Sequence, residues 1–372
     1  MRIALLTRRY DPAGGGTERD LIVTADHLRR AGHELTIYAS EIRGDPDGVK
    51  VRRVGGRGPR ALALLQFGLA AGAVARRDGA ELVVSFARVA EADVFRSGGS
   101  AHACYLRAAR LWRGRLSAAA MWLSPYHCLQ MYLERRGFRS HKLRKAIAVS
   151  NLVRDELNQQ FALGEGIAIT LYNGVDLERF RPCADAHARS SIRARYAIPT
   201  GVRMVAFVGN GFGRKGLRAL VEAWPLLPRA AWLLVAGADR AVSSYQERAR
   251  ELGVDARIVF AGPLPDAREV FAAADAFALP SLFEPFGNAA LEAMACGLPV
   301  LTTSRCGVAE SVPPEMRAYI VERPTDPGEI ALRLGELLEA PKGLPAAARG
   351  AAEQFTWTRY GAQLNALLDS LS

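Results

Sequence analysis

Short apolar runs alternate with amphipathic stretches along the first half of the chain. The runs RIALLT at residues 2–7 and ELVVSF at 81–86 are typical of strands buried on both faces of a parallel sheet. This alternation predicts a doubly wound α/β domain. Further strands are expected over HELTIYAS, 49–54 and 146–150, with helices over about 60–77 and 151–161.

A loop of three glycines at residues 14–16 follows the first predicted strand. A helix is expected to open at Thr17, where Asp20 three residues later would complete a capping box, and to end at Gly32. The glycines could form a bare turn. Three in succession between a strand and a helix also suit close approach of the backbone to a ligand.

A second alternating series follows residues 169–176, where the sequence ITLYNGVD ends a strand in Asn and Gly. We therefore expect two Rossmann-like domains facing each other across a cleft, with the ligand at the carboxyl ends of strands. The first domain would comprise residues 1–174 with a helical tail at 355–372, and the second residues 175–354. The strands expected in the second domain are 203–209, 232–237, 257–262, AFALP, PVLTT and AYIV, with helices ending near 226 and spanning 243–252 and 266–274.

Composition places the chain among globular proteins, because 49% of its residues are hydrophobic and 23% are charged. The opening MRIALLTRRY is too weakly apolar for a signal peptide, and no run reaches the roughly 18 apolar residues of a membrane span. These features predict a cytoplasmic protein. The five cysteines form no CxxC pair, so we expect reduced thiols, no disulfide and no zinc site.

The net charge of +11 is concentrated between Arg96 and Lys145, where eleven basic residues face Glu134 alone. Arginines and aromatic residues interleave there, a mixture typical of helices at a lipid interface. Packing on the first domain is the alternative. Nucleic acid is not expected, because no nucleic-acid module is recognisable. The residues expected to bind an anionic membrane surface are Arg107, Arg110, Trp112, Arg113, Arg115 and Trp122.

The stretch EPFGNAALEAMACGLPVLTT carries two carboxylates, Glu284 and Glu292, around a turn that feeds a helix beginning near Asn288. The N-terminus of such a helix presents unpaired N–H groups and partial positive charge, which suit phosphate or sugar oxygens. A purely structural alternative is that Asn288 caps the helix and Glu292 is solvated.

The glycine-rich loop GNGFGRKG at 209–216 also follows a strand. It has neither the spacing of a phosphate loop nor the context of a dinucleotide fingerprint, so ATP and NAD are not expected. Arg214 and Lys215 on this loop would suit a diphosphate, since Arg forks two oxygens and Lys adds a point charge. An ordinary charged surface loop is the alternative.

Four motifs of the second half, VGNGFGRKG, FAGPLPD, EPFGNAALE and MACGLPVLTT, resemble in sequence and order the retaining glycosyltransferases of family 4, which have the two-domain GT-B fold. NGVDLERFRP resembles the linker of that family. In the first half, YDPAGGGTERD and ADVFRSGGSAHACYL resemble the branch of lipopolysaccharide core heptose glucosyltransferases.

The resemblance implies a role for each matching residue. Arg214 and Lys215 would bind the donor diphosphate and stabilise leaving-group charge, and Glu292 would bind the ribose. Glu284 would hold the transferred sugar. A first-domain catalytic residue would correspond to Asp93 or His102, with a plain structural role as the alternative for His102. The remaining donor-binding residues implied are Gly15, Gly16, Gly209, Phe286, Gly287 and Asn288.

The family as a rule requires no metal or other cofactor. The resemblance implies transfer of a hexose, glucose from UDP-glucose, to the heptose of the lipopolysaccharide inner core at the cytoplasmic face of the inner membrane. Two alternatives stay open. One is a family 4 enzyme using another nucleotide sugar for a different lipid-linked or exopolysaccharide acceptor, and the other is a non-catalytic protein that binds the membrane surface.

Overall fold

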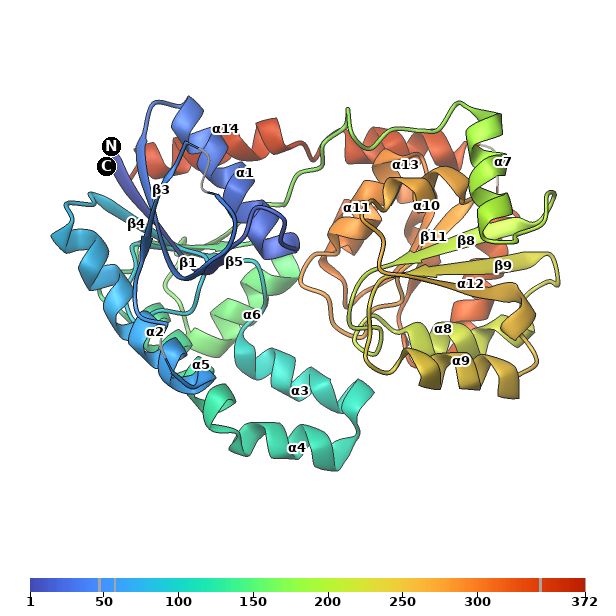
Figure 1. Cartoon of the computed structure of the whole chain (residues 1–372), viewed down its shortest axis with the longest axis horizontal. Coiled ribbons are helices and arrows are strands. Elements are labelled where there is room, and N and C mark those ends of the chain that lie inside the picture. Colours follow the sequence, from blue (N-terminus) through green and yellow to red (C-terminus); the bar gives the residue numbers. More distant parts are fainter. Residues whose placement is uncertain (46–47, 57, 341–342, 372) are drawn as a thin grey trace. The chain divides into compact units, whose positions relative to one another are not determined.

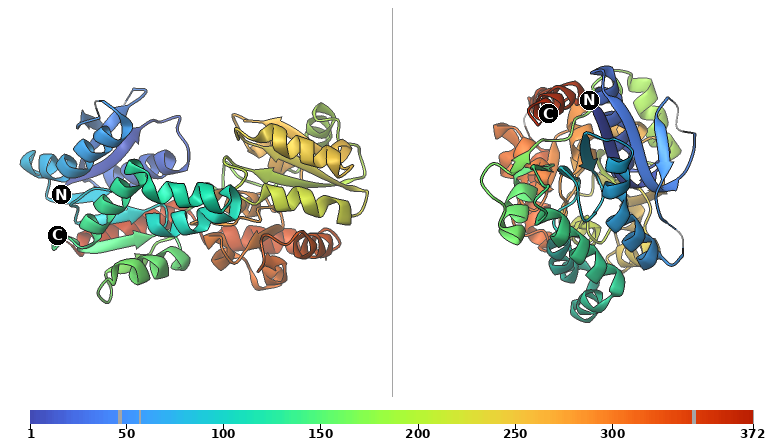
Figure 2. Two further views of the ribbon diagram at one scale, coloured as in Figure 1. Left: turned by 90° about the horizontal axis from the view of Figure 1, so that it is seen from below. Right: turned by 90° about the vertical axis from the view of Figure 1, so that its left-hand side faces the viewer.

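The computed structural model describes residues 1–45, 48–56, 58–340 and 343–371. The chain divides into two compact units, one built mainly from residues 1–174 with the segment from Trp357 onward, the other mainly from Val175–Thr356. Each unit has one parallel sheet with helices on both of its faces (Figures 1 and 2). The predicted α/β class with two parallel sheets is confirmed. Residue 372, at the end of the predicted tail, lies outside the described residues.

The sheet of the first unit has the order β3-β2-β1-β4-β5-β6-β7, and its paired strands are parallel. The chain builds outward from β1 in one direction and then returns to add β4 on the other side. The crevice at the carboxyl ends of β1 and β4 is therefore the topological switch point, where such sheets bind ligands. The strands are β1 (Arg2–Tyr10), β2 (Glu34–Ile42), β3 (Lys50–Arg53), β4 (Leu82–Ser85), β5 (Val94–Ser97), β6 (Lys145–Ala148) and β7 (Ala168–Thr170).

One strand of this sheet, β5, is absent from the sequence-based expectation. Its apolar core is only Val94 and Phe95, between the charged residues Asp93 and Arg96. The strand is nevertheless buried because both charges are paired: Arg76 donates to Asp93 at 2.7 Å, and Arg96 lies 3.3 Å from Asp20.

Helix α1 begins one residue earlier than expected and is capped differently. Gly15 is its N-cap, and no side chain caps it. The predicted capping box is wrong, because Thr17 lies inside the helix and Asp20 is buried beside Arg96. The helices of this unit are α1 (Gly16–Arg30), α2 (Arg60–Arg77), α3 (His102–Arg113), α4 (Arg115–Leu123), α5 (Pro125–Phe138), α6 (Asn151–Phe161) and α14 (Trp357–Asp369).

The last helix, α14, packs beside α1 in the first unit (Figure 1). Tyr360, Leu364 and Leu368 are buried in one hydrophobic cluster with Leu21 and Leu28 of α1. Below them, the Tyr360 hydroxyl accepts a hydrogen bond from Arg96 Nε at 2.8 Å. The tail is thus part of the core of this unit.

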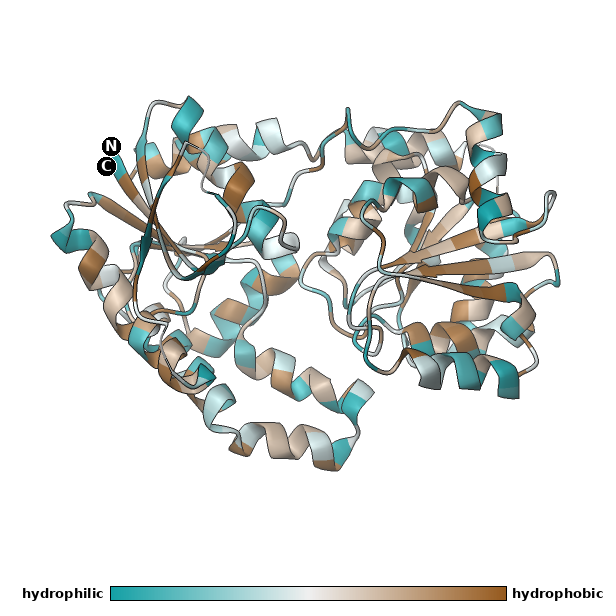
Figure 3. Cartoon of the chain, viewed as in Figure 1, coloured by the Kyte–Doolittle hydropathy of each residue, from teal (hydrophilic) through white to brown (hydrophobic). Residues whose placement is uncertain are grey.

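The sheet of the second unit has the order β10-β9-β8-β11-β12-β13, so its switch point lies between β8 and β11. Its inner strands are strongly apolar, as Figure 3 shows. The strands are β8 (Arg203–Val208), β9 (Ala231–Ala236), β10 (Ile258–Gly262), β11 (Ala276–Ala278), β12 (Val300–Thr303) and β13 (Ile320–Val321).

The helices of this unit cover both faces of its sheet (Figure 1). They are α7 (Ala186–Arg195), α8 (Leu217–Ala223), α9 (Val242–Glu251), α10 (Arg268–Ala273), α11 (Asn288–Ala295), α12 (Pro327–Leu338) and α13 (Leu344–Ala352), with short 3-10 turns η1 (Trp224–Leu226), η2 (Asp255–Arg257), η3 (Gly307–Ser311) and η4 (Pro314–Tyr319).

Candidate functional site

The glycine-rich loop at 209–216 leaves the carboxyl end of β8 and is fixed at its middle. Phe212 is buried and packs edge-on against the rings of Phe207 and Tyr245. The backbone N–H of Phe212 donates to Asp239 Oδ2 at 2.6 Å, and Asn210 Oδ1 accepts from the N–H of Ala238 at 2.7 Å. These contacts hold the loop so that Arg214 and Lys215 have defined positions.

Three predicted site residues form one ion cluster at this switch point. Arg214 Nη1 and Lys215 Nζ both donate to Glu284 Oε2, at 2.8 Å and 2.7 Å. Arg214 Nη1 also donates to the carbonyl oxygen of Phe283 at 2.8 Å. The side chains of Arg214, Lys215 and Glu284 are 26%, 11% and 12% exposed. The structure therefore brings the expected diphosphate-binding and sugar-binding residues into direct contact.

Burial by itself would raise the pKa of the Glu284 carboxyl, but the charges of Lys215 and Arg214 and the hydrogen bonds that they donate outweigh it. They lower the pKa of Glu284 to about 2. Glu284 is therefore ionised at every physiological pH, and it orients both cations.

Gly209 makes room for this cluster. Its φ is +149°, and a Cβ there would lie 2.5 Å from Lys215 Cε and 2.7 Å from Lys215 Cδ. The side chain of Lys215 thus crosses directly over the Gly209 backbone. A larger residue would have to displace it.

The segment after β11 is held against the residues that follow β12. The N–H of Glu284 donates to the carbonyl of Arg305 at 3.1 Å, and the N–H of Val308 donates to that of Phe286 at 2.6 Å. Gly287 adopts a φ of +101° and is the N-cap of α11, where no side chain caps the helix. The predicted start of this helix at Asn288 is confirmed, whereas Asn288 does not cap it.

Glu292 lies in α11, one turn after Asn288, and both side chains are partly exposed. Phe286 and Gly287 are buried just ahead of them. All the donor-binding residues predicted in the second half therefore lie on the loop after β8, the loop after β11 or the first turns of α11.

In the first unit, Gly15 and Gly16 are exposed at the N-terminus of α1. A Cβ built on Gly15 would meet no atom closer than Glu18 Oε2 at 4.0 Å. The backbone there is open, as the sequence-based prediction of a ligand contact requires.

Asp93 lies at the amino edge of the sheet, where it accepts hydrogen bonds from Arg76 and from the N–H of Val83, each at 2.7 Å. Ligands of such sheets bind at the carboxyl edge. Its position disfavours the catalytic role expected for it, and its two contacts are those of a structural residue.

His102 is buried at the start of α3. One of its ring nitrogens, Nε2, lies 2.9 Å from His127 Nδ1, and its backbone N–H donates to Glu134 at 2.8 Å. Burial, followed by the charges of Arg88 and His127, lowers the pKa of His102 to about 3. The imidazole is therefore neutral near pH 7.

The basic segment forms α3, α4 and α5, but its charges have different environments. Arg107, Arg110, Arg113 and Arg115 are exposed, whereas Arg96 is buried in a strand and Lys142 pairs with Glu91 at 2.5 Å. The charged surface is thus smaller than the sequence count suggests. Apolar residues exposed on α4 and α5 are Leu116, Trp122, Leu123 and Tyr132.

None of the described helices combines the length and apolar character needed to cross a bilayer. Among the same residues, no group of three His, Cys, Asp or Glu side chains is placed to hold a metal ion.

Sequence reasoning missed several residues that build the site. Phe212 and Asp239 fix the loop after β8, and Cys306 donates to the Phe286 carbonyl at 3.2 Å. An aspartate two residues after the apolar strand WLLVAG was a usable signal for Asp239, since it lies just past the carboxyl end of a neighbouring strand.

Two family models match the chain: "Glycosyltransferase Family 4" over residues 14–179 and "Glycosyl transferases group 1" over residues 188–355. Among curated relatives, the D-inositol 3-phosphate glycosyltransferase of Xylanimonas cellulosilytica is 35% identical over 203 residues, 51% of this chain and 48% of that protein. The lipopolysaccharide glucosyltransferase WaaG of Escherichia coli K12 is 26% identical over 324 residues, 84% of this chain and 83% of that protein. The chain spans about half the length of the first curated relatives that it matches.

Solved structures share the fold. The crystal structure of WaaG, a glycosyltransferase involved in lipopolysaccharide biosynthesis, superposes with a TM-score of 0.79 at 23% identity, covering 97% of this chain and 98% of that one. The Anabaena protein Alr3699/HepE in complex with UDP-glucose gives a TM-score of 0.75 at 18% identity, with 100% of each chain covered. These likenesses confirm the expected GT-B architecture.

Proposed function

Because the chain belongs to the family 4 glycosyltransferases, we propose that it transfers a hexose from a nucleotide sugar, with retention of anomeric configuration. The donor we propose is UDP-glucose and the acceptor the heptose of the lipopolysaccharide inner core. The observation that carries the proposal is the cluster of Arg214, Lys215 and Glu284 at the switch point of the second sheet, beside the N-terminus of α11.

Arg214 and Lys215 bind the donor diphosphate in this proposal. One guanidinium and one ammonium, held on a fixed loop, neutralise much of the charge of two phosphate groups. The N-terminal N–H groups of α11 add partial positive charge close to Glu284. When the bond from sugar to phosphate breaks, negative charge grows on the leaving oxygen, and cations already in position stabilise it without reorganisation.

The carboxylates of Glu284 and Glu292 bind hydroxyl groups of the nucleotide sugar. Glu284 accepts hydrogen bonds from the transferred hexose, with the backbone of Phe286, Gly287 and Asn288 completing the sugar subsite, and Glu292 accepts from the ribose. In this proposal the acceptor hydroxyl attacks the anomeric carbon from the face that the leaving diphosphate vacates. The new glycosidic bond forms as the bond from sugar to phosphate breaks, and the hydroxyl proton passes to the leaving phosphate oxygen. Neutral His102 is the first-unit candidate for a contact to the hexose, since its lowered pKa of about 3 suits hydrogen bonding rather than charge.

Two related proteins support the choice of donor and acceptor. HepE has been solved in complex with UDP-glucose, and WaaG of Escherichia coli is a lipopolysaccharide glucosyltransferase that aligns with most of this chain. A second candidate acceptor is a phosphorylated polyol, because a D-inositol 3-phosphate glycosyltransferase matches part of this chain at 35% identity, above the 26% of WaaG.

We further propose that the protein works at the cytoplasmic face of an anionic membrane. Exposed arginines on α3 and α4 would contact lipid phosphates, and Trp112 and Trp122 would lie at headgroup depth. Leu116 and Leu123 are 89% and 84% exposed on α4, which supports an interfacial role for that helix.

Incubation with radiolabelled UDP-glucose and lipopolysaccharide truncated to the inner core tests the enzymatic proposal. Label in the lipopolysaccharide is expected. Absence of both transfer and donor hydrolysis would contradict it. A panel of nucleotide sugars, assayed by the rise in melting temperature, identifies the donor by mass action.

Flotation with phosphatidylglycerol-containing vesicles tests the membrane proposal. Replacing Arg107, Arg110, Arg113 and Arg115 by Gln is expected to release the protein, since each basic residue near such a surface contributes about 1 kcal/mol. Hydrolysis of soluble UDP-glucose should persist. Vesicle binding that survives the four changes contradicts the membrane role.

A further inference from the structure

A second polar site lies wholly within the first unit. A pocket of about 590 Å³ opens at the carboxyl ends of β1 and β4, with Arg8 and Arg9 from β1 and Arg88 from the segment after β4. Ser97 and Gly98 from the end of β5 complete this edge. This is the switch point of the first sheet, the position where doubly wound sheets bind ligands.

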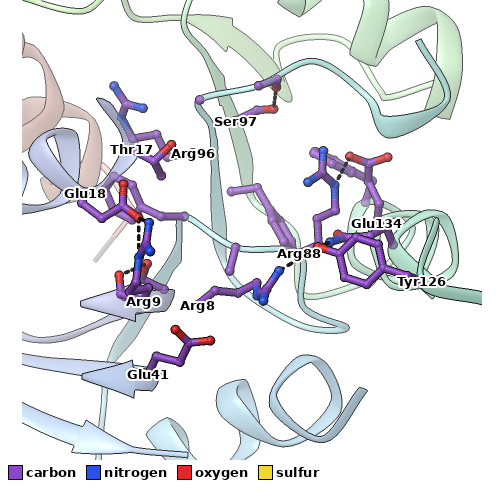
Figure 4. Close-up of a pocket in the computed structure, with 18 of the residues that line it drawn as sticks. Arg8, Arg9, Thr17, Glu18, Glu41, Arg88, Arg96, Ser97, Tyr126 and Glu134 are labelled. Atoms are coloured by element: carbon purple, nitrogen blue, oxygen red, sulfur yellow. Dashed lines mark hydrogen bonds and ion pairs between the residues drawn. The ribbon is translucent and has the colours of Figure 1, made fainter. Parts of the chain in front are cut away.

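The pocket carries an excess of positive charge. Five guanidiniums and three carboxylates line it, which leaves two positive charges in excess. Most of the arginines are already neutralised. Arg9 pairs with Glu18 at 2.7 Å and Arg88 with Glu134 at 2.9 Å, as Figure 4 shows, and Arg96 lies 3.3 Å from Asp20. The five guanidiniums are those of Arg8, Arg9, Arg60, Arg88 and Arg96, and the three carboxylates those of Glu18, Glu41 and Glu134.

Asp20 does not line the pocket, and Glu41, the third lining carboxylate, lies 3.9 Å from Arg43, which does not line it either. The excess therefore comes from Arg8 and Arg60, for which the described residues supply no carboxylate within ion-pair distance. Both donate instead to the hydroxyl of Tyr126, at 2.8 Å and 3.1 Å, and Gln130 donates to the same oxygen at 2.9 Å. Figure 4 shows Arg8 pointing across the pocket to Tyr126. A phenol oxygen has two lone pairs, so three donors compete for it.

Tyr126 keeps the two arginines in place. The guanidinium of Arg60 lies over its ring, 4.1 Å from the centroid, a cation–π geometry. Burial would raise the pKa of Tyr126, but the charges of Arg8 and Arg60 and the donated hydrogen bonds lower it. The phenol oxygen therefore feels a strong positive potential, which a bound anion would share.

We propose that this pocket binds an anionic group, a phosphomonoester or a carboxylate, on the sugar acceptor, and that Arg8 and Arg60 are the residues that grip it. Assigning the anion to the acceptor rests on the proposed function, whereas anion binding itself rests on the pocket. Two forked guanidiniums on one side of a pocket match the paired oxygens of phosphate or carboxylate. A neutral sugar would leave both arginines without a counter-charge.

The binding test compares glucose 6-phosphate with glucose by calorimetry in saturating UDP, so that the donor loop is occupied. We expect glucose 6-phosphate to bind at least about tenfold more tightly than glucose, and Arg8→Gln with Arg60→Gln to weaken it by about 10- to 100-fold. Arg77→Gln is the matched control, because Arg77 is exposed at the other end of α2 and does not line the pocket. It should leave the affinity for glucose 6-phosphate unchanged.

Tyr126→Phe gives a second measurement. It removes the hydroxyl acceptor and keeps the ring under Arg60, so the affinity for glucose 6-phosphate should fall less than in the double variant. Melting temperatures check that each variant is folded. If Arg8→Gln does not fold, Arg8→Lys replaces it. Lysine keeps the positive charge but cannot donate two parallel hydrogen bonds, so the affinity for glucose 6-phosphate should be intermediate.

A parallel titration with vesicles of phosphatidylcholine and phosphatidic acid distinguishes a soluble anion from a lipid headgroup. If the double substitution weakens binding of glucose 6-phosphate alone, the result supports a soluble acceptor. If it also weakens binding of the vesicles, the result supports a lipid-linked acceptor. Equal affinities for glucose and glucose 6-phosphate, or no response of either probe to the double substitution, overturns the proposal. Failure of UDP to bind would instead contradict the proposed function. The glucose 6-phosphate titration is then repeated without UDP in Lys215→Gln, so that the donor loop does not compete for the phosphate.

Discussion

The switch point of each sheet holds two cations that donate to one acceptor oxygen, and the positive charge is partly balanced in the second unit and unbalanced in the first. In the second unit, one carboxylate, Glu284, accepts from both Arg214 and Lys215. In the first unit, Arg8 and Arg60 converge on a phenol, which has no charge to offer them. The two clusters therefore differ in the group that accepts hydrogen bonds from the two cations, which is a carboxylate in the second unit and a phenol in the first.

The difference bears on how each cluster meets an anion. At the Glu284 cluster an incoming diphosphate finds cations that are already oriented and partly neutralised, so the gain in attraction is moderated and geometry dominates. At the Tyr126 cluster the positive charge is uncompensated, so attraction dominates and added salt weakens it. Both clusters lie at the switch point of their sheet, and the group that accepts from the two cations determines how strongly each cluster attracts an anion.

The largest expected effect comes from removing both cations of the second unit. Arg214→Gln with Lys215→Gln should lower the transfer rate by at least about 1,000-fold, since each aligned charged donor contributes about 100-fold or more at a developing negative charge. Steady-state transfer from UDP-glucose measures it. Arg229→Gln, an exposed change on the same unit, is the control. Rates within tenfold of the unmodified protein would remove these residues from the diphosphate site.

The next prediction concerns acid stability. Glu284 has a folded pKa of about 2, below its ordinary value of 4.5, so its ionised form stabilises the fold above pH 4.5. That contribution, about 3 kcal/mol, is lost as the pH falls from 4.5 towards 2. Urea unfolding of Glu284→Gln should therefore show a deficit in unfolding free energy at pH 7 that shrinks as the pH falls through this window. A deficit that does not change with pH would show that the carboxylate is not held by Arg214 and Lys215.

Glu292 should have a smaller effect, confined to binding. Glu292→Ala is expected to weaken UDP binding by about 1.5–3 kcal/mol for each charged hydrogen bond to the ribose. Calorimetry with UDP measures it, and Glu247→Ala on the exposed face of α9 is the matched control. UDP affinity equal to that of the control would remove Glu292 from the ribose.

The smallest expected effect is at Gly209. Gly209→Ala would place Cβ 2.5 Å from Lys215 Cε at a φ of +149°, so the lysine must move and the backbone is strained. We expect a loss of about 1 kcal/mol in unfolding free energy and a several-fold weaker UDP affinity. A variant with unchanged UDP affinity would show that Lys215 tolerates displacement.

The regular parts of the fold follow from apolar periodicity. The long strand β1 and most strands of the second unit fall where short apolar runs predict them, because buried parallel strands need such runs. β5 was not predicted because Asp93 and Arg96 flank only two apolar residues. The residues that neutralise them, Arg76 and Asp20, lie outside this short segment of sequence. Short-range pattern contains no information about those pairings.

The candidate site shows the same limit. The sequence identified Arg214, Lys215 and Glu284 and predicted that each would meet a ligand. It could not indicate that they meet one another, because Lys215 and Glu284 lie 69 positions apart in the sequence and only the adjacency of β8 and β11 brings them together. In the basic segment, a count of charges overstated the exposed surface, since burial of Arg96 depends on Tyr360 near the other end of the chain.

The contact between Arg96 and Tyr360 also affects the order in which the protein takes shape during synthesis. The first unit buries α14, which the ribosome makes after the whole second unit. Arg96 and Asp20 would otherwise be charges beside an open apolar face, so the core of the first unit stays incomplete until α14 emerges. Apart from Leu111–Arg113, the second unit is one continuous segment, Val175–Thr356, and it can close first, which reverses the usual order from N-terminus to C-terminus. The nascent first unit is therefore the part that depends most on protection from aggregation until α14 is made.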